Sequence, residues 1–369
     1  GRFSNSNALD LNNASSKLLL SSSITVDRVS TSLASLGLDV DADSTVSHLT
    51  VGHTTPVSIA SGKTLYGAIT LTAGSIKLDE TGTLGSSVTM SGGTLDADET
   101  LTLFGALSQS GNITIDVASG KTLTYSGAAL NLGAYTLTMS GEGRFSNTYV
   151  LGLNNASSKL LLSSSITVDN VSTSLASLGL DVDGDSTVSS LTVAHTTPVS
   201  IASGKTLSGA ITVTAGSIKL GEAGTLASTV SMSGGTLDAD NSSTLSGALS
   251  QSGSITIDVA DDETLTYSGA ALNLGAYTLT MSGGGTLSNT NAFVLNNASS
   301  KLLLNSITVD NVSTSLASLG LDVDDDSTVS SLTVAHTTPV SIASGKTLSG
   351  AISITDGSIK LGEAGTLAS

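Results

Sequence analysis

Apolar and polar residues alternate over short stretches of this chain. In 211–214, Ile-Thr-Val-Thr, every second residue is apolar, and the alternation recurs in 229–233, 236–240 and 254–259. A period of two predicts strands with one buried face. Ser-Gly, Gly-Gly and Ala-Gly pairs between such stretches predict corners, because glycine adopts a positive φ at little cost. We therefore expect two or three short strands per structural repeat, for example 205–208, 210–214 and 217–220.

A ladder of Thr-Leu and Thr-Val pairs runs through the chain at steps of about 20 residues. Its apolar members are Phe3, Val26, Val46, Leu65, Leu84, Leu103, Leu123, Phe145, Val168, Val188, Leu207, Leu226, Leu245, Leu265, Leu287, Val309, Val329, Leu348 and Leu367. Only Arg2 and Arg144 replace the preceding threonine. Such a period is typical of a β-solenoid, in which each coil stacks its apolar residue on that of the preceding coil. We predict an all-β parallel β-helix with 19–20 residues per coil.

A longer repeat is superimposed on the coils. The sequence of 1–5, Gly-Arg-Phe-Ser-Asn, returns at 143–147 and more weakly from Gly285, and seven ladder steps sum to 142 residues. We therefore predict one continuous solenoid over 1–369 with long repeats 1–142, 143–284 and 285–369, the third incomplete. Neither terminus resembles a capping element, so we expect a section of a longer array. The stretch 29–38 and its copies 171–180 and 312–321 fit either a short helical turn or a distorted strand.

Composition and charge narrow the function classes. The chain is 39% hydrophobic but only 3% aromatic, and its aliphatic residues can form a core. Thirty acidic and 13 basic residues give a net charge of −17, which argues against a nucleic-acid partner and favours cations or basic surfaces. The absence of cysteine excludes disulfides and thiolate metal sites. No apolar run approaches the roughly 18 residues of a spanning helix, so we expect no membrane span.

The strongest metal candidate is the sequence Asp-Val-Asp-Ala-Asp at 39–43 and its copies. Its predicted ligands are Asp39, Asp41, Asp43, Asp181, Asp183, Asp185, Asp322, Asp324 and Asp326. Alternate spacing should place three carboxylates on one strand face, where they repel unless a cation or solvent intervenes. The pattern resembles the start of a calcium loop, but Ser44 and Thr50 replace its glycine and glutamate. A calcium site and a solvated acidic turn both remain open. Asp96 and Asp98, repeated as Asp238 and Asp240, form a weaker second candidate.

Two other motifs have structural interpretations. Ser-Gly-Lys-Thr at 61–64, 119–122, 203–206 and 344–347 resembles the end of a phosphate-binding loop, but the loop's first glycine is absent and a strand follows. We interpret it as a turn entering a strand. His53, His195 and His336 each precede Thr-Thr-Pro, one in each long repeat. They are too far apart in a solenoid to share a metal, and we expect them to line turns.

Several longer phrases resemble the repeats of bacterial surface proteins. They are SGGTLDADETLTL at 91–103, NITIDVASGKTLTYSGAALNL at 112–132 and GAYTLTMSGGGTLSN at 275–289. They are similar in style and period to autotransporter passenger and filamentous-haemagglutinin-like adhesin repeats. The resemblance covers nearly the whole chain and implies a right-handed parallel β-helix, secretion and a place at the bacterial cell surface. The ladder itself does not set the handedness, so a left-handed solenoid stays an alternative. It identifies no functional residue.

The sequence favours a structural role. A rod is built by repeating the same local packing many times, whereas an enzyme needs its active site only once. We expect a secreted rod, fibre or stalk that is not an enzyme and requires no cofactor, with calcium as the one ion to consider. Its partners would be further copies, joined end to end or laterally, or a ligand on a host or cell surface. Two alternatives remain: a polysaccharide-active β-helix enzyme whose site lies outside this chain, and an ice-binding solenoid with outward threonines such as Thr212 and Thr214.

Overall fold

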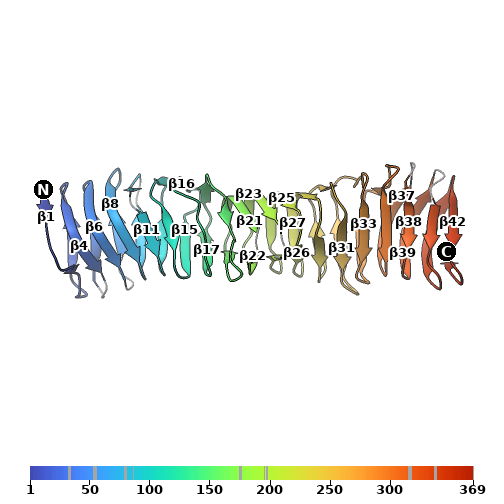
Figure 1. Ribbon diagram of the computed structural model, residues 1–369, viewed down its shortest axis with the longest axis horizontal. Coiled ribbons are helices and arrows are strands. Elements are labelled where there is room, and N and C mark those ends of the chain that lie inside the picture. Colours follow the sequence, from blue (N-terminus) through green and yellow to red (C-terminus); the bar gives the residue numbers. More distant parts are fainter. Residues whose placement is uncertain are drawn as a thin grey trace. The chain divides into compact units, whose positions relative to one another are not determined.

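The computed structural model describes residues 1–31, 35–52, 56–78, 81–85, 87–173, 177–194, 196, 198–314, 318–335 and 339–368 (Figure 1). These residues form strands and turns, without a helix. Consequently, the described part of the chain has no helix long and apolar enough to cross a membrane. Strands of successive coils pair in parallel, as β4 (Thr25–Thr31), β6 (Ser44–Val51) and β8 (Thr64–Leu71) do. The predicted all-β parallel β-solenoid is confirmed.

The chain divides into two compact units, Gly1–Ser189 and Ser190–Ser369, and each contains strands of two sheets. In unit 1 the first sheet holds β4, β6 and β8 together with β1 (Arg2–Phe3), β2 (Leu9–Asp10), β10 (Thr83–Leu84), β11 (Ser87–Met90), β13 (Leu101–Leu103), β14 (Leu107–Gln109), β16 (Thr122–Tyr125), β18 (Arg144–Asn147), β19 (Leu151–Gly152) and β21 (Thr167–Thr173). The second sheet of unit 1 holds β3 (Lys17–Leu20), β5 (Gly37–Val40), β7 (Pro56–Ile59), β9 (Ser75–Leu78), β12 (Thr94–Ala97), β15 (Ile113–Val117), β17 (Thr136–Gly141), β20 (Lys159–Leu162) and β22 (Gly179–Val182).

Unit 2 repeats this arrangement, and β23 (Ser186–Val193) contains the boundary. Its first sheet holds β25 (Thr206–Val213), β27 (Thr225–Met232), β29 (Ser243–Leu245), β30 (Leu249–Gln251), β32 (Thr264–Tyr267), β34 (Thr286–Asn289), β35 (Phe293–Val294), β37 (Thr308–Thr314), β39 (Ser327–Val334), β41 (Thr347–Ile354) and β43 (Thr366–Ala368). Its second sheet holds β24 (Pro198–Ile201), β26 (Ser217–Leu220), β28 (Thr236–Ala239), β31 (Ile255–Val259), β33 (Thr278–Ser282), β36 (Lys301–Asn305), β38 (Gly320–Val323), β40 (Pro339–Ile342) and β42 (Ser358–Leu361).

The predicted apolar ladder forms the core of each unit. In unit 2, Leu207 of β25 lies opposite Leu226 of β27, which lies opposite Leu245 of β29. All three side chains are buried. Alternation holds along the short strands too: in β9 Ile76 and Leu78 are buried while Ser75 and Lys77 are partly exposed. Each inward aliphatic contributes about 1.5–3 kcal/mol when fully buried, and much of that burial comes from the neighbouring coil.

The ladder is not continuous in register, which corrects the prediction that every member stacks on the next. Leu245 lies opposite Tyr267, and Leu265 lies opposite Ser243. In unit 1, Leu103 likewise lies opposite Tyr125. Each shift is two residues, so the inward face stays inward. The long repeats thereby bury a tyrosine in a core that the sequence had suggested was aliphatic.

Coil corners are made by glycines, and one corner type differs from expectation. The stretches 205–208 and 210–214 were predicted as two strands, but β25 runs unbroken over Thr206–Val213. Gly209 bends this strand with φ at 118°. In the equivalent β8, Gly67 has φ at 120°, and a Cβ there would lie 1.8 Å from the carbonyl oxygen of Val46. Only glycine allows the strand to turn there without a break.

The stretch 29–38 is partly placed. Its first residues continue β4 up to Thr31, and its last residues begin β5 at Gly37. Residues 32–34 lie outside the described residues, as do 174–176 and 315–317 of the copies. The choice between a helical turn and a distorted strand therefore stays a prediction.

Candidate functional site

The structure places the aspartates of the predicted calcium cluster on different parts of the coil. Strand β5 ends at Val40, so only Asp39 belongs to it, and Asp41 and Asp43 lie in the turn that precedes β6. The expectation that all three share one strand face is therefore wrong. The copies behave alike: Asp181 is in β22 and Asp322 is in β38, while the later aspartates of each cluster follow the strand.

The first aspartate of each cluster pairs with a lysine of the preceding coil. Lys17 Nζ lies 2.5 Å from Asp39 Oδ2, Lys159 Nζ lies 2.5 Å from Asp181 Oδ2, and Lys301 Nζ lies 2.6 Å from Asp322 Oδ2. These lysines belong to the recurring sequence Asn-Asn-Ala-Ser-Ser-Lys-Leu. The pairs are partly exposed, so each contributes at most about 1 kcal/mol. They nevertheless neutralise one carboxylate in every cluster.

The last aspartate of the cluster binds the next coil. The backbone N–H of Thr64 donates to Asp43 Oδ1 at 2.8 Å, and that of Thr347 donates to Asp326 Oδ1 at 2.7 Å. Asp41, Asp183 and Asp324 are exposed. Within the described ranges, no group of three or more His, Asp or Glu side chains is arranged to hold a metal ion. Calcium binding by these clusters stays a prediction.

The Ser-Gly-Lys-Thr motif is a turn entering a strand, as predicted. The N–H of Lys63 donates to the carbonyl of Ala60 at 3.0 Å, and Gly62 has φ at 68°. Thr64 then begins β8. The same turn precedes β16, β25 and β41. At two of these turns the first N–H of the strand donates to an aspartate of the preceding coil, Asp43 or Asp326.

A second acidic feature is a column of aligned side chains on the second sheet. Asp96 lies in register between Lys77 on β9 and Asp116 on β15. Lys77 Nζ lies 2.5 Å from Asp98, and the Ser140 hydroxyl bonds Asp116. Burial, followed by the charges of Asp98 and Asp116, raises the pKa of Asp96 to about 6.

The copy of this column in unit 2 differs in its lysine. Lys219 Nζ lies 2.9 Å from Asp238 Oδ2 and 3.2 Å from Asp240 Oδ2, so it contacts both acids. Burial raises the pKa of Asp238, and hydrogen bonding from Lys219 opposes this. The hydrogen bonds that Lys219 donates to Asp238 and Asp240 raise the pKa of the lysine. In both columns, charged side chains on neighbouring coils therefore lie in contact.

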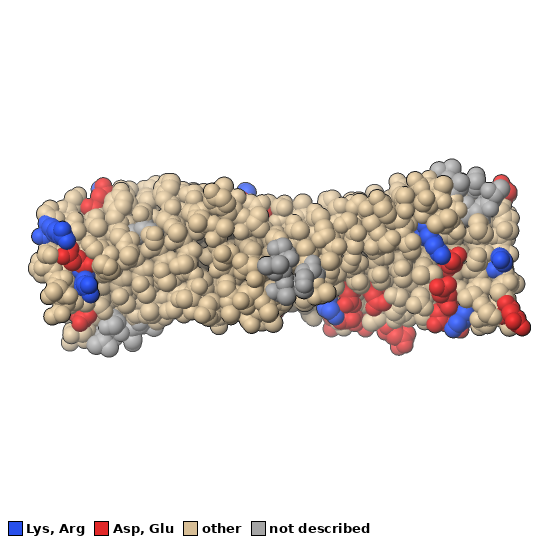
Figure 2. All heavy atoms as spheres, viewed as in Figure 1, with Lys and Arg blue, Asp and Glu red and all other residues tan. Residues whose placement is uncertain are grey.

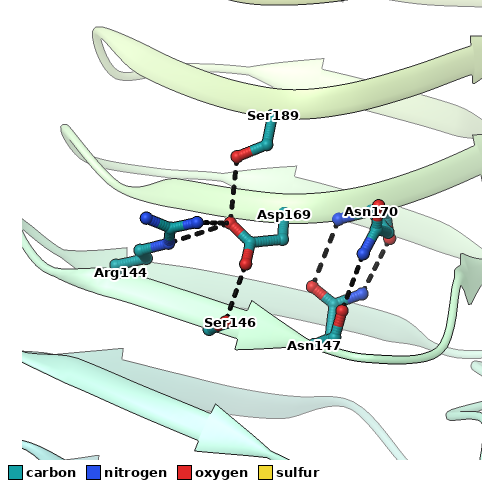
Figure 3. A network of polar contacts seen from close by, with 6 residues as sticks. All are labelled: Arg144, Ser146, Asn147, Asp169, Asn170 and Ser189. Atoms are coloured by element: carbon teal, nitrogen blue, oxygen red, sulfur yellow. Dashed lines mark hydrogen bonds and ion pairs between the residues drawn. The ribbon is translucent and has the colours of Figure 1, made fainter.

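The most connected polar site surrounds Asp169, on β21 (Figure 3). Arg144 on β18 donates to its Oδ1 from Nε at 2.9 Å and pairs with it through Nη2 at 2.7 Å. The Ser146 hydroxyl donates to Oδ2 at 2.7 Å, and the Ser189 hydroxyl donates to Oδ1 at 2.9 Å. Three successive coils therefore meet on one carboxylate.

Beside it, two asparagines bond across coils. Asn147 Nδ2 donates to the carbonyl of Asn170 at 2.8 Å, and Asn170 Nδ2 donates to the carbonyl of Asn147 at 2.7 Å (Figure 3). Asn147 is only 3% exposed. Because a buried amide without partners is costly, this reciprocal pair fixes the register of the two coils.

The network recurs with substitutions. In the third repeat Ser288 and Ser330 donate to Asp310 at 2.6 and 2.8 Å, and Asn289 and Asn311 form the amide pair. Here Thr286 replaces the arginine. In the first repeat the groups are Arg2, Ser4, Asp27 and Asn5, and Arg28 replaces the second asparagine. Sequence reasoning missed this network, although Arg2 and Arg144, the two exceptions to the threonine ladder, were its signal.

Two other sequence candidates have the following outcomes. His53, His195 and His336 lie outside the described residues, so their role in turns stays a prediction. Thr212 and Thr214 are outward and exposed, but Thr212 lies opposite Ser231 in the next coil. The outward threonine row required for an ice-binding face is thus interrupted at this coil.

Comparisons with known proteins found no matching family model, no matching curated protein and no matching solved structure. The residues therefore have to supply the functional argument themselves.

Proposed function

We propose that this chain is a secreted repetitive structural protein that forms a rod, fibre or stalk at the bacterial cell surface. The observation that carries the proposal is the in-register burial of Leu207, Leu226 and Leu245 on successive coils. A coil gains this burial only from its neighbours, so the sequence favours repeated stacking over a single compact centre. The surface-protein resemblance supports secretion and a right-handed winding.

The conserved polar contacts between coils fit the same role. The Lys–Asp pairs, the Asp169 network and the Asn147–Asn170 pair all join neighbouring coils. Such contacts make register specific, because a slipped coil would leave buried amides unpartnered. We further propose that the chain itself performs no turnover, and that it associates with further copies or with a surface ligand. A turnover assay on surface polysaccharides tests the first of these.

Small-angle X-ray scattering and electron microscopy of the purified full chain test the rod. Coils spaced about 4.8 Å apart over 18 ladder steps predict a particle roughly 86 Å long with a constant cross-section. Particles of similar extent in all directions would contradict the proposal. Electron microscopy of the native material then distinguishes the two versions of the proposed structural role. Long uniform fibres indicate a filament subunit, and single rods with a distinct head indicate an adhesin stalk.

A further inference from the structure

The first long repeat differs from its copies at the outer side of the asparagine network. Arg28 stands where the copies have Asn170 and Asn311, and His48 stands where they have Ser190 and Ser331. Arg28 of β4 and His48 of β6 are register partners on adjacent coils, and both are exposed. The substitutions therefore place a cationic arginine and a histidine next to each other on one surface.

These residues line a hollow of about 560 Å³ in unit 1. The residues that line it are all polar or charged and include Arg2, Asn5, Ser6, Arg28, Ser47 and His48. The volume is in the range of small-molecule sites. In Figure 2 most charged atoms visible on this face of unit 1 lie over its first coils, where Figure 1 labels β1, β4 and β6.

The acid in this hollow is already neutralised. Asp27 accepts from Arg2 Nε at 3.1 Å and from Arg2 Nη2 at 3.0 Å, and the Ser4 hydroxyl donates to its other oxygen at 2.5 Å. These hydrogen bonds, with Ser4 first, hold the pKa of Asp27 below its usual value. Asp27 therefore stays ionised and matched by Arg2.

Arg28 is left with its charge unmatched. Within the described ranges no carboxylate lies within ion-pair distance of its guanidinium, whereas Lys17, Arg2 and Lys159 each pair with an aspartate. An arginine in a hollow without an ion pair in the described ranges leaves a positive charge available to an anionic ligand. The planar guanidinium of Arg28 can donate two parallel hydrogen bonds to a carboxylate, and His48 adds a further N–H donor.

We propose that this hollow binds the carboxylate of an acidic saccharide unit, with Arg28 and His48 as the anion-binding pair. The hydroxyls of Ser6 and Ser47 would face the sugar hydroxyls. Ser189 and Ser330, the copies of Ser47, donate to Asp169 and Asp310, whereas Asp27 accepts from Arg2 and Ser4. No Phe, Tyr, Trp, Leu, Ile or Val side chain of the described residues lines the hollow, which favours a hydroxylated over an apolar ligand. The inference goes beyond the structural role and does not depend on it.

The chain provides its own matched variants. Arg28→Asn with His48→Ser installs the residues that the third repeat carries at these positions in the same coil geometry. Titration calorimetry of the full chain with trigalacturonate should show binding that weakens about fivefold or more in the double variant, as expected for a lost charge-assisted contact. Maltotriose, a neutral trisaccharide, should not bind. Circular dichroism and the thermal midpoint verify that the variant is folded.

A gain-of-binding variant tests the same geometry elsewhere. Asn311→Arg with Ser331→His recreates the pair on β37 and β39, where the parent residues are register partners. In the Arg28→Asn, His48→Ser background it should restore part of the affinity. Unchanged binding after loss of Arg28 and His48, or equal binding of maltotriose, would overturn the proposal. Acetate competing as well as the saccharide at equal concentration would overturn the saccharide assignment. None of these outcomes bears on whether the molecule is a rod.

Discussion

Each buried tyrosine of the core stacks on a phenylalanine, but the two repeats supply that phenylalanine from different positions. The ring centroids of Tyr125 and Phe145 are 6.1 Å apart, and those of Tyr267 and Phe293 are 5.9 Å apart. Phe145 corresponds to Leu287, and Phe293 corresponds to Leu151. One large and one smaller residue have therefore exchanged places between repeats, which conserves the volume of the core.

This exchange predicts compensation between two substitutions. Phe145→Leu should destabilise the protein by about 1–2 kcal/mol through a partly filled cavity, and Leu151→Phe should cost about 1–3 kcal/mol through overpacking. The double variant reproduces the arrangement around Tyr267, so it should lose less stability than the sum of the single variants. Urea denaturation followed by circular dichroism measures all three, and strict additivity would contradict the prediction.

Asp96 makes the stability depend on pH. Its pKa is raised from 3.8 to about 6, so the folded state binds its proton more tightly than the unfolded state does. The stabilisation from this proton is complete below pH 3.8 and is lost as the pH rises through about 6. Asp96→Asn should therefore stabilise the protein at pH 7 by about 1 kcal/mol after solvent screening, and by much less at pH 4.

The copy of Asp96 in unit 2 gives a matched control. Asp238 contacts Lys219 at 2.9 Å, so Asp238→Asn removes an ion pair together with the buried charge. We expect this variant to gain less at pH 7 than Asp96→Asn does. Thermal midpoints of both variants and the parent between pH 4 and pH 7 test this. An equal rise in the thermal midpoint of both variants at pH 7 would show that the ion pair between Lys219 and Asp238 does not contribute to stability.

At the scale of the strand, sequence alternation predicts which residues point inward but not which residues pair. The buried positions of β9 and β25 follow directly from their alternating apolar residues. The register of Leu245 opposite Tyr267 does not, because a shift of two residues leaves the pattern unchanged. The Asp169 network escaped prediction for a related reason: its members come from three coils, and only the register brings them together.

The bend in β8 leads to a prediction about strands. Gly67→Ala would place a Cβ 1.8 Å from the Val46 carbonyl oxygen at a φ of 120°, so the two coils must separate locally. We expect a loss of about 3 kcal/mol or more. Gly152→Ala is the matched control, since a Cβ there meets nothing within 4 Å. Denaturation midpoints should separate the two variants clearly, and similar losses would argue against the close approach.

At the scale of the whole molecule, the net charge of −17 opposes compaction through repulsion between acidic side chains. Contacts between coils offset part of this repulsion. The Lys17–Asp39 pair and its two copies recur once in each long repeat. The sequence indicated the clusters of aspartate. It could not show that a lysine 21 or 22 residues earlier lies beside the first carboxylate, because that proximity depends on the coil length. The exposed Asp41 and its copies retain the capacity to attract cations.

The calcium prediction can be tested on this charge distribution. Sites of the extracellular type bind calcium with a Kd of about 1 mM or below, so about 10 mM calcium should stabilise the folded chain by about 1.4 kcal/mol per occupied site. Sodium chloride at the same ionic strength screens repulsion without occupying a site and serves as the control. Substituting Asp41, Asp183 and Asp324 with asparagine leaves the Lys–Asp pairs intact and should remove the specific part of the shift. Equal thermal midpoints in calcium and sodium would mean that these clusters are solvated turns. Contacts between coils alone would then offset the repulsion between the acidic side chains of the solenoid.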